Sequence, residues 1–207
     1  SAASDVYKRK GQCREVTMKM ADCAVQALRG SLLSVTDYTP ALAEQVRADE
    51  EATDHYEDIL GTYLVKLSSQ TLTAADSENA TELLKVIGDF ERIADHAVNI
   101  VESAEELQSK GLTLSEAAQA DLKVLDAAVA EILDRSADAF RRGDAQAAAA
   151  VEPLEQVVDL LKEQLRTRHI LRMREGKCSI EAGFVWADLL TDLERTSDHC
   201  SNIAGSV

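Results

Sequence analysis

The sequence contains few aromatic residues, only two prolines and no long apolar run. Aromatic residues make up 4% of the 207 residues, so alanine and leucine must supply most of the packing contacts. This composition favours helices, and the scarcity of proline leaves long helices unbroken. No stretch approaches the ~20 apolar residues that span a bilayer, and no signal peptide is visible. We therefore expect a helical, cytoplasmic protein.

Basic residues are also scarce, with 22 lysines and arginines against 37 aspartates and glutamates and a formal net charge of -15. Such a surface repels phosphate backbones and anionic lipid head groups, so no nucleic-acid partner is expected. Cations and basic protein surfaces are the favoured partners. The four cysteines form no Cys-x-x-Cys pair, which predicts free thiols in a reducing compartment.

One ten-residue segment occurs twice. The sequences ERIADHAVNI at 91–100 and ERTSDHCSNI at 194–203 share Glu, Arg, Asp, His, Asn and Ile at matching positions. The copies lie about half a chain apart, which is typical of a duplicated domain and not of a solenoid of short repeats. We predict one repeat over 1–110 and a second over 111–207.

Apolar residues at helical spacing and capping signals predict six long helices and no strand. The predicted helices cover about 5–34, 40–69, 76–110, 115–142, 144–175 and 179–207. Gly30 weakens the end of the first helix, and Pro153 predicts a kink or a restart in the fifth. Short connections make neighbouring helices antiparallel, so the fold class is all-α, with two similar antiparallel three-helix bundles in up-and-down order.

Aspartate follows glutamate at the fourth position in only four places, two in each half. Residues four apart lie on one face of a helix. At 1.5 Å per residue, the aspartates of the first half lie about 30 Å from the turn that joins their helices, and those of the second half about 26 and 33 Å, so each two are roughly level. The four pairs are Glu50 and Asp54, Glu91 and Asp95, Glu155 and Asp159, and Glu194 and Asp198.

Each half can therefore bring two glutamates and two aspartates onto one patch. Carboxylates this close repel one another unless a cation or an arginine neutralises them. Oxygen ligands suit magnesium, calcium or manganese, and carboxylate clusters also hold iron, so a site for a divalent or iron-type metal is one interpretation. The other is a pair of solvated helix faces in which Arg92 and Arg195 form ordinary ion pairs.

The remaining polar residues of the repeated segment are predicted to support the carboxylates. The histidines lie one position off the carboxylate stripe, which favours buried hydrogen bonding over metal ligation. The asparagines could orient a carboxylate or cap a neighbouring backbone group. These supporting residues are Arg92, His96, Asn99, Arg195, His199 and Asn202. His55 and His169 have no counterpart in the other half and are predicted to be surface residues.

The two ERIADHAVNI-like segments, the four Glu-x-x-x-Asp pairs and the six-helix duplication resemble the PhoU family of phosphate-responsive regulators. The stretch 63–100 looks most like the PhoU-type domain that follows the membrane part of bacterial sodium/phosphate cotransporters. That resemblance implies a soluble domain of an inner-membrane transporter, within a longer chain. It also implies regulation of phosphate transport and no catalysis.

The resemblance further implies multinuclear metal clusters on the acidic motifs, one on Glu50, Asp54, Glu91 and Asp95 and one on Glu155, Asp159, Glu194 and Asp198. The second copy departs from the common motif at Thr196, Ser197 and Cys200, so metal is the weaker expectation there. The implied partners are the membrane domain of a phosphate transporter or a phosphate-sensing protein, with phosphate itself bound through metal, and a homo-oligomer is left open.

Two other functions are compatible with a helical acidic protein. One is a metal-free scaffold, with the carboxylates as a docking surface for a basic partner. The other is a carboxylate-bridged di-metal oxidoreductase, but such bundles use Glu-x-x-His motifs and no glutamate here has a histidine at the third position. Hydrolysis by a nucleophilic serine or cysteine has no supporting motif.

Overall fold

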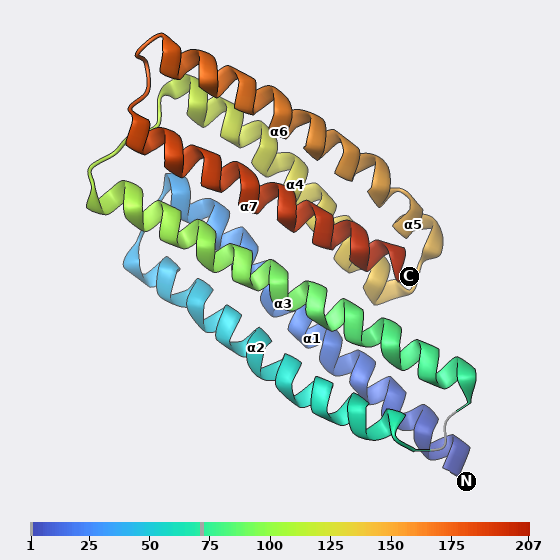
Figure 1. The fold of residues 1–207 in the computed structure, drawn as a ribbon. Helices are drawn as coiled ribbons and strands as arrows, with labels where there is room; N and C mark the ends of the chain where they lie inside the picture. The colour runs from blue at the N-terminus through green and yellow to red at the C-terminus, as the bar shows by residue number, and fades with distance from the viewer. Residues whose placement is uncertain (1, 71–72) are drawn as a thin grey trace.

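The computed structural model describes residues 2–70 and 73–207, and this part of the chain contains helices and no strand (Figure 1). The predicted all-α fold is confirmed. The helices are α1 (Ala2–Thr36), α2 (Pro40–Ser68), α3 (Ala74–Ser109), α4 (Glu116–Arg142), α5 (Ala145–Ala149), α6 (Val151–Arg174) and α7 (Ile180–Gly205).

Several helix ends follow the predicted capping signals, although α3 begins at Ala74, capped by Thr73, and not at the predicted Asp76. The Thr39 hydroxyl accepts from the backbone N–H of Leu42, with Pro40 at the first helical position of α2. Gly143 ends α4 with a φ of 63°, a conformation that glycine adopts without steric cost. The polar break predicted between α2 and α3 includes residues 71 and 72, which lie outside the described residues.

Gly30 lies inside α1 and does not end it. A Cβ atom built on Gly30 would lie 2.9 Å from Cγ2 of Val46 on α2. The glycine therefore permits the two helices to approach closely, and this packing offsets the lower helix propensity of the residue.

The fifth predicted helix is divided into α5 and α6 at Ala150. Pro153 lies in the first turn of α6 and has no N–H to donate to the carbonyl three or four residues earlier. The predicted restart is thus confirmed, and it falls just before the proline.

The helices pack as two groups, which we call the first bundle (α1, α2 and α3) and the second bundle (α4, α5, α6 and α7). In Figure 1 the two groups lie next to each other, with α3 and α7 side by side along the junction. Phe90 of α3 and Trp186 of α7 are fully buried in a core made mainly of alanine and leucine. Among the described residues, no helix is both long and apolar enough to cross a membrane.

Candidate metal centres

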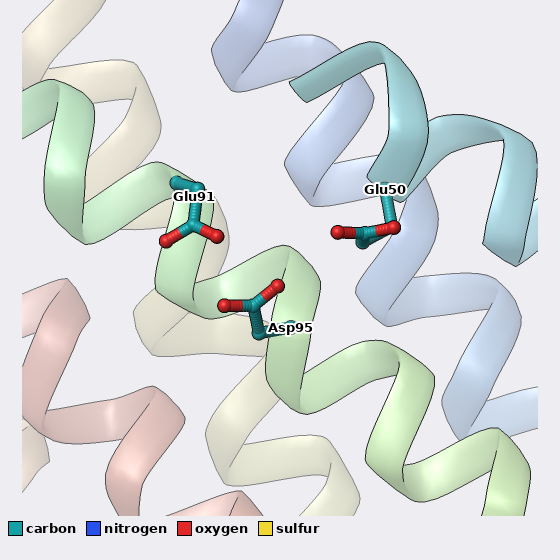
Figure 2. A group of neighbouring side chains, drawn as sticks. All are labelled: Glu50, Glu91 and Asp95. Atoms are coloured by element: carbon teal, nitrogen blue, oxygen red, sulfur yellow. The ribbon is translucent and has the colours of Figure 1, made fainter. Parts of the chain in front are cut away.

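A cluster of carboxylates joins α2 to α3 in the first bundle. Figure 2 shows Glu50 on α2 pointing toward Glu91 and Asp95 on α3. One carboxylate oxygen from each of the three lies within 4.8 Å of the others. The two Glu-x-x-x-Asp pairs thus meet as the helical spacing predicts.

Two further carboxylates extend this group. Asp54 and Glu57, one turn apart on α2, form a second set of three with Glu91, again within 4.8 Å. Glu57 was not predicted, because it lies outside the Glu-x-x-x-Asp pattern, although it follows Asp54 at a helical spacing of three. We refer to Glu50, Asp54, Glu57, Glu91 and Asp95 as the first cluster.

The electrostatics of the first cluster reflect crowded negative charge. Burial raises the pKa of Glu91 to about 8, helped by a hydrogen bond with Asp95 and by the charges of Asp95, Glu57 and Asp54. Burial and the neighbouring carboxylates likewise raise the pKa values of Glu50 and Glu57. A bound cation would remove this repulsion and favour the ionised forms.

The second bundle has a similar group of carboxylates, with a lysine at a position where the first bundle has a glutamate. Glu155 and Asp159 on α6 meet Asp198 on α7 within 4.8 Å. Glu194 does not join them, because its carboxylate forms an ion pair with Lys162. Lys162 follows Glu155 by seven residues, as Glu57 follows Glu50 in the first bundle.

We refer to Glu155, Asp159, Glu194 and Asp198 as the second cluster. Burial and the two aspartates raise the pKa of Glu155 to about 7, so the second cluster is also electrostatically strained. The lysine, however, supplies a positive charge of its own to Glu194.

The donor sets fit a metal better in the first cluster than in the second. The first offers five carboxylates in two sets of three that share Glu91, and no lysine or arginine of the described residues lies within ion-pair distance of them, although the more distant charge of Arg92 acts on Glu57. Its Glu57 Oε2 is buried and has no hydrogen-bond partner, as a free ligand atom would be. Asp159 Oδ1 is similar in the second cluster, but Lys162 occupies the place of one ligand there.

The recurring histidines lie between the two bundles. His96 Nδ1 is 3.2 Å from a carboxylate oxygen of Asp192, and His199 Nδ1 is 3.0 Å from one of Asp89. The two imidazole rings stack on each other, with centroids 5.4 Å apart. These contacts agree with the hydrogen-bonding role predicted for the two histidines. They join α3 to α7.

The asparagines complete this junction. Asn99 donates to Asp192 and Asn202 to Asp89, each across 3.4 Å, so they orient a carboxylate and do not cap a backbone group. Sequence reasoning missed both aspartates, although they also recur: each stands two residues before the repeated segment.

Three other residues lie differently from expectation. Arg92 and Arg195 are exposed and no acidic group of the described residues lies within ion-pair distance of them, although the charge of Arg92 opposes the rise in the pKa of Glu57. The prediction that His169 is a surface residue is wrong. Its side chain is buried against Trp186, with ring centroids 5.8 Å apart, because α6 turns this position toward α7.

These features define an all-helical protein made of two related three-helix bundles, each with a carboxylate cluster on its second and third long helices. The PhoU domain family matches residues 17–104 and 123–207, one match in each half. The chain belongs to the PhoU family.

Relatives with names of this family are similar over most of the chain. A phosphate-specific transport system accessory protein PhoU homolog of Pseudomonas aeruginosa is 25% identical over 194 residues, covering 92% of this chain and 78% of the relative. PhoU homolog 1 of Thermotoga maritima is 28% identical over 125 residues, 60% of this chain and 53% of that protein.

Two solved structures share the fold. The crystal structure of PhoU from Pseudomonas aeruginosa has a TM-score of 0.77 at 25% identity and covers 99% of this chain and 94% of its own. The phosphate transport system regulatory protein PhoU from Streptococcus pneumoniae has a TM-score of 0.85 at 17% identity, covering 97% and 94%. The latter likeness concerns the fold alone.

Proposed function

We propose that this chain is a regulatory protein of phosphate transport that binds metal at the first cluster. Its relatives are named as accessory proteins of phosphate-specific transport systems. The observation that carries the metal proposal is the meeting of five carboxylates on α2 and α3 with no basic ion-pair partner among the described residues.

The first cluster would hold a divalent or iron-type ion. Glu50, Glu91 and Asp95 supply one set of neighbouring oxygens, and Asp54 and Glu57 a second set that shares Glu91. Such an ion supplies positive charge and open coordination positions that an oxyanion such as phosphate can occupy. The protein's own part is to hold these carboxylates level on two rigid helices.

We place this activity on the cytoplasmic side of the membrane, with a phosphate transporter or a phosphate-sensing protein as the partner. The names of the relatives point to a transporter in a separate chain. The alternative partner is the membrane domain of a sodium/phosphate cotransporter. Regulation requires no chemical step on a substrate, and none is proposed.

The test is the metal content of the purified protein together with its control of phosphate uptake. Asp95→Asn keeps the size of the side chain and removes one charge from the first cluster. Elemental analysis of protein purified without chelator is expected to show stoichiometric metal in the parent and a clear loss in Asp95→Asn. Asp188→Asn, which changes an exposed aspartate outside both clusters, should keep the metal.

Phosphate uptake by cells that carry each variant gives the second readout. Loss of metal and loss of uptake control together in Asp95→Asn support the proposal. A parent protein that contains no metal, or an Asp95→Asn protein that loses metal and still controls uptake, would instead favour the metal-free scaffold. The carboxylates would then act as a docking surface for a basic partner.

A further inference from the structure

The second bundle contains a cavity of about 190 Å³ between α6 and α7. Lys162 and Arg166 line it from α6, Thr191 lines it from α7, and no acidic side chain of the described residues does so. The Lys162 ammonium is paired with Glu194, but the Arg166 guanidinium has no hydrogen bond or ion pair with any described residue. A cavity lined by basic and not by acidic side chains is unusual in a chain with a formal net charge of -15.

The first bundle has a larger cavity of about 580 Å³ at the equivalent place. Its charged lining residues are Glu57, Asp58 and Lys66, so it has no excess of basic residues, and Gly61 and Gly88 also line it. The second bundle has Arg166 and Thr191 where the first has the two glycines, at the same spacing from the carboxylate pairs. The longer side chains narrow the second cavity, and the Arg166 guanidinium adds hydrogen-bond donors to it, whereas the Thr191 hydroxyl donates to the Ala187 carbonyl.

One side chain that lines the second cavity carries a buried donor without a partner. Trp186 is completely buried and lines the cavity, and its indole Nε1 has no hydrogen-bond partner. His169 also lines the cavity and is buried, with its ring against the backbone of Gly183. The adjacent Arg172 has two buried guanidinium nitrogens without a partner. A buried donor without an acceptor is costly, and an acceptor in the cavity would remove that cost.

We propose that this cavity binds an oxyanion of the size of inorganic phosphate. The Arg166 guanidinium presents parallel N–H groups that match two oxygens of such an anion, and Trp186, whose indole N–H has no partner, is one of the lining residues. The volume of about 190 Å³ exceeds several-fold the ~30 Å³ that a water molecule occupies in the liquid. Binding here requires neither a metal nor the regulatory role proposed above, so either proposal can fail without the other.

The experiment measures binding of radiolabelled inorganic phosphate by equilibrium dialysis, using chelator-treated protein at constant ionic strength. Trp186 is the only tryptophan, so its fluorescence reports on the cavity in a parallel titration. Arg166→Gln removes the exposed, unpaired guanidinium, and Arg174→Gln removes another exposed arginine of α6 as a matched control. We expect saturable binding with a fluorescence change, weakened at least about tenfold in Arg166→Gln and unchanged in Arg174→Gln.

Three results would overturn the proposal. The first is the absence of saturable binding to the chelator-treated parent protein. The second is equal weakening by the two arginine variants, which would indicate only a general effect of charge. The third is binding that requires metal, disappears in Asp95→Asn and is unaffected by Arg166→Gln. This last result would place phosphate on metal in the first cluster, and so would support the proposed function while excluding the cavity.

Discussion

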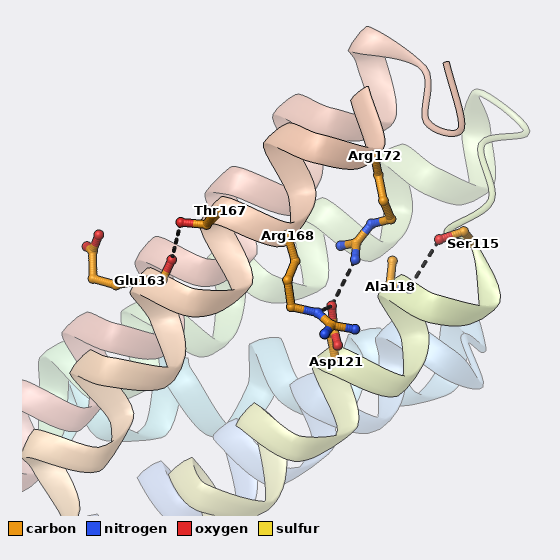
Figure 3. A network of polar contacts seen from close by, with 7 residues as sticks. All are labelled: Ser115, Ala118, Asp121, Glu163, Thr167, Arg168 and Arg172. Carbon is orange, nitrogen blue, oxygen red and sulfur yellow. Dashed lines mark hydrogen bonds and ion pairs between the residues drawn. The ribbon is translucent and has the colours of Figure 1, made fainter. Parts of the chain in front are cut away.

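The buried ion pair between α4 and α6 allows a quantitative test of the second bundle. Asp121 on α4 accepts hydrogen bonds from Arg168 Nε at 3.0 Å and from Arg172 Nη1 at 2.9 Å (Figure 3). The side chains of Asp121 and Arg172 are each only 10% exposed, whereas that of Arg168 is 58% exposed. The Arg172 guanidinium also lies 5.4 Å from the centre of the Trp186 ring.

Asp121→Ala leaves the buried Arg172 charge without its carboxylate. Removal of one partner from a buried pair costs about 3 to 5 kcal/mol, and the exposed Arg168 adds at most about 1 kcal/mol. The contact with Trp186 remains and stabilises the guanidinium, so we expect the lower end, about 3 kcal/mol. For a chain of this length that loss corresponds to a fall of roughly 6 to 12 °C in Tm.

Urea unfolding followed by circular dichroism, together with thermal melts, measures this change. Asp121→Leu combined with Arg172→Met replaces the pair by apolar side chains and should recover most of the lost free energy of unfolding. Arg135→Ala, which breaks an exposed pair with Glu131, should change it by less than about 0.5 kcal/mol. A loss below about 1 kcal/mol in Asp121→Ala, or a double variant no more stable than the single one, would refute this account of the pair.

Two further predictions follow from charge. Lys162→Glu frees Glu194 and restores the ligand pattern of the first cluster, so elemental analysis should find more metal per chain; unchanged metal content would show that the lysine is not what limits the second cluster. Burial raises the pKa of Asp126 to about 7, above its value of 3.8 in the unfolded chain, so its stabilising contribution is complete below about pH 4 and is lost as the pH rises through 7. Asp126→Asn should therefore raise the free energy of unfolding at pH 8 by about 1 to 2 kcal/mol and at pH 5 by only about a third as much, as measured by urea unfolding, and an equal effect at both values would contradict this cause.

The sequence predicts the long helices and the meeting of the acidic pairs because both depend on local, regular rules. Capping residues such as Thr39 and Ser115 set helix starts, and a fixed rise per residue sets which carboxylates are level. Glu50 and Asp95 come from different helices and still meet as that rise requires. The division of the chain into two repeats between residues 110 and 111 stays a prediction.

Contacts that depend on the packing of whole helices are less accessible from the sequence. The contact of His169 with Trp186 depends on how α6 is rotated against α7, although the position matches the buried Leu64 at the spacing that relates Glu155 to Glu50. Lys162 could have been found by extending the alignment of the two halves beyond the acidic pairs, because it occupies the position that matches Glu57. The same extension by two residues upstream of the repeated segment would have revealed Asp89 and Asp192.

The junction between the bundles lies directly beside the clusters, and this proximity constrains how they can respond to a ligand. His96 follows Asp95 in the chain, and it contacts the opposite bundle through Asp192. His199 follows Asp198 and contacts Asp89 in the same way. Because consecutive residues of a rigid helix move together, a rotation of α3 that accommodates a cation at Asp95 also moves His96 against α7. The two bundles therefore share one junction that lies one residue from an aspartate of each cluster.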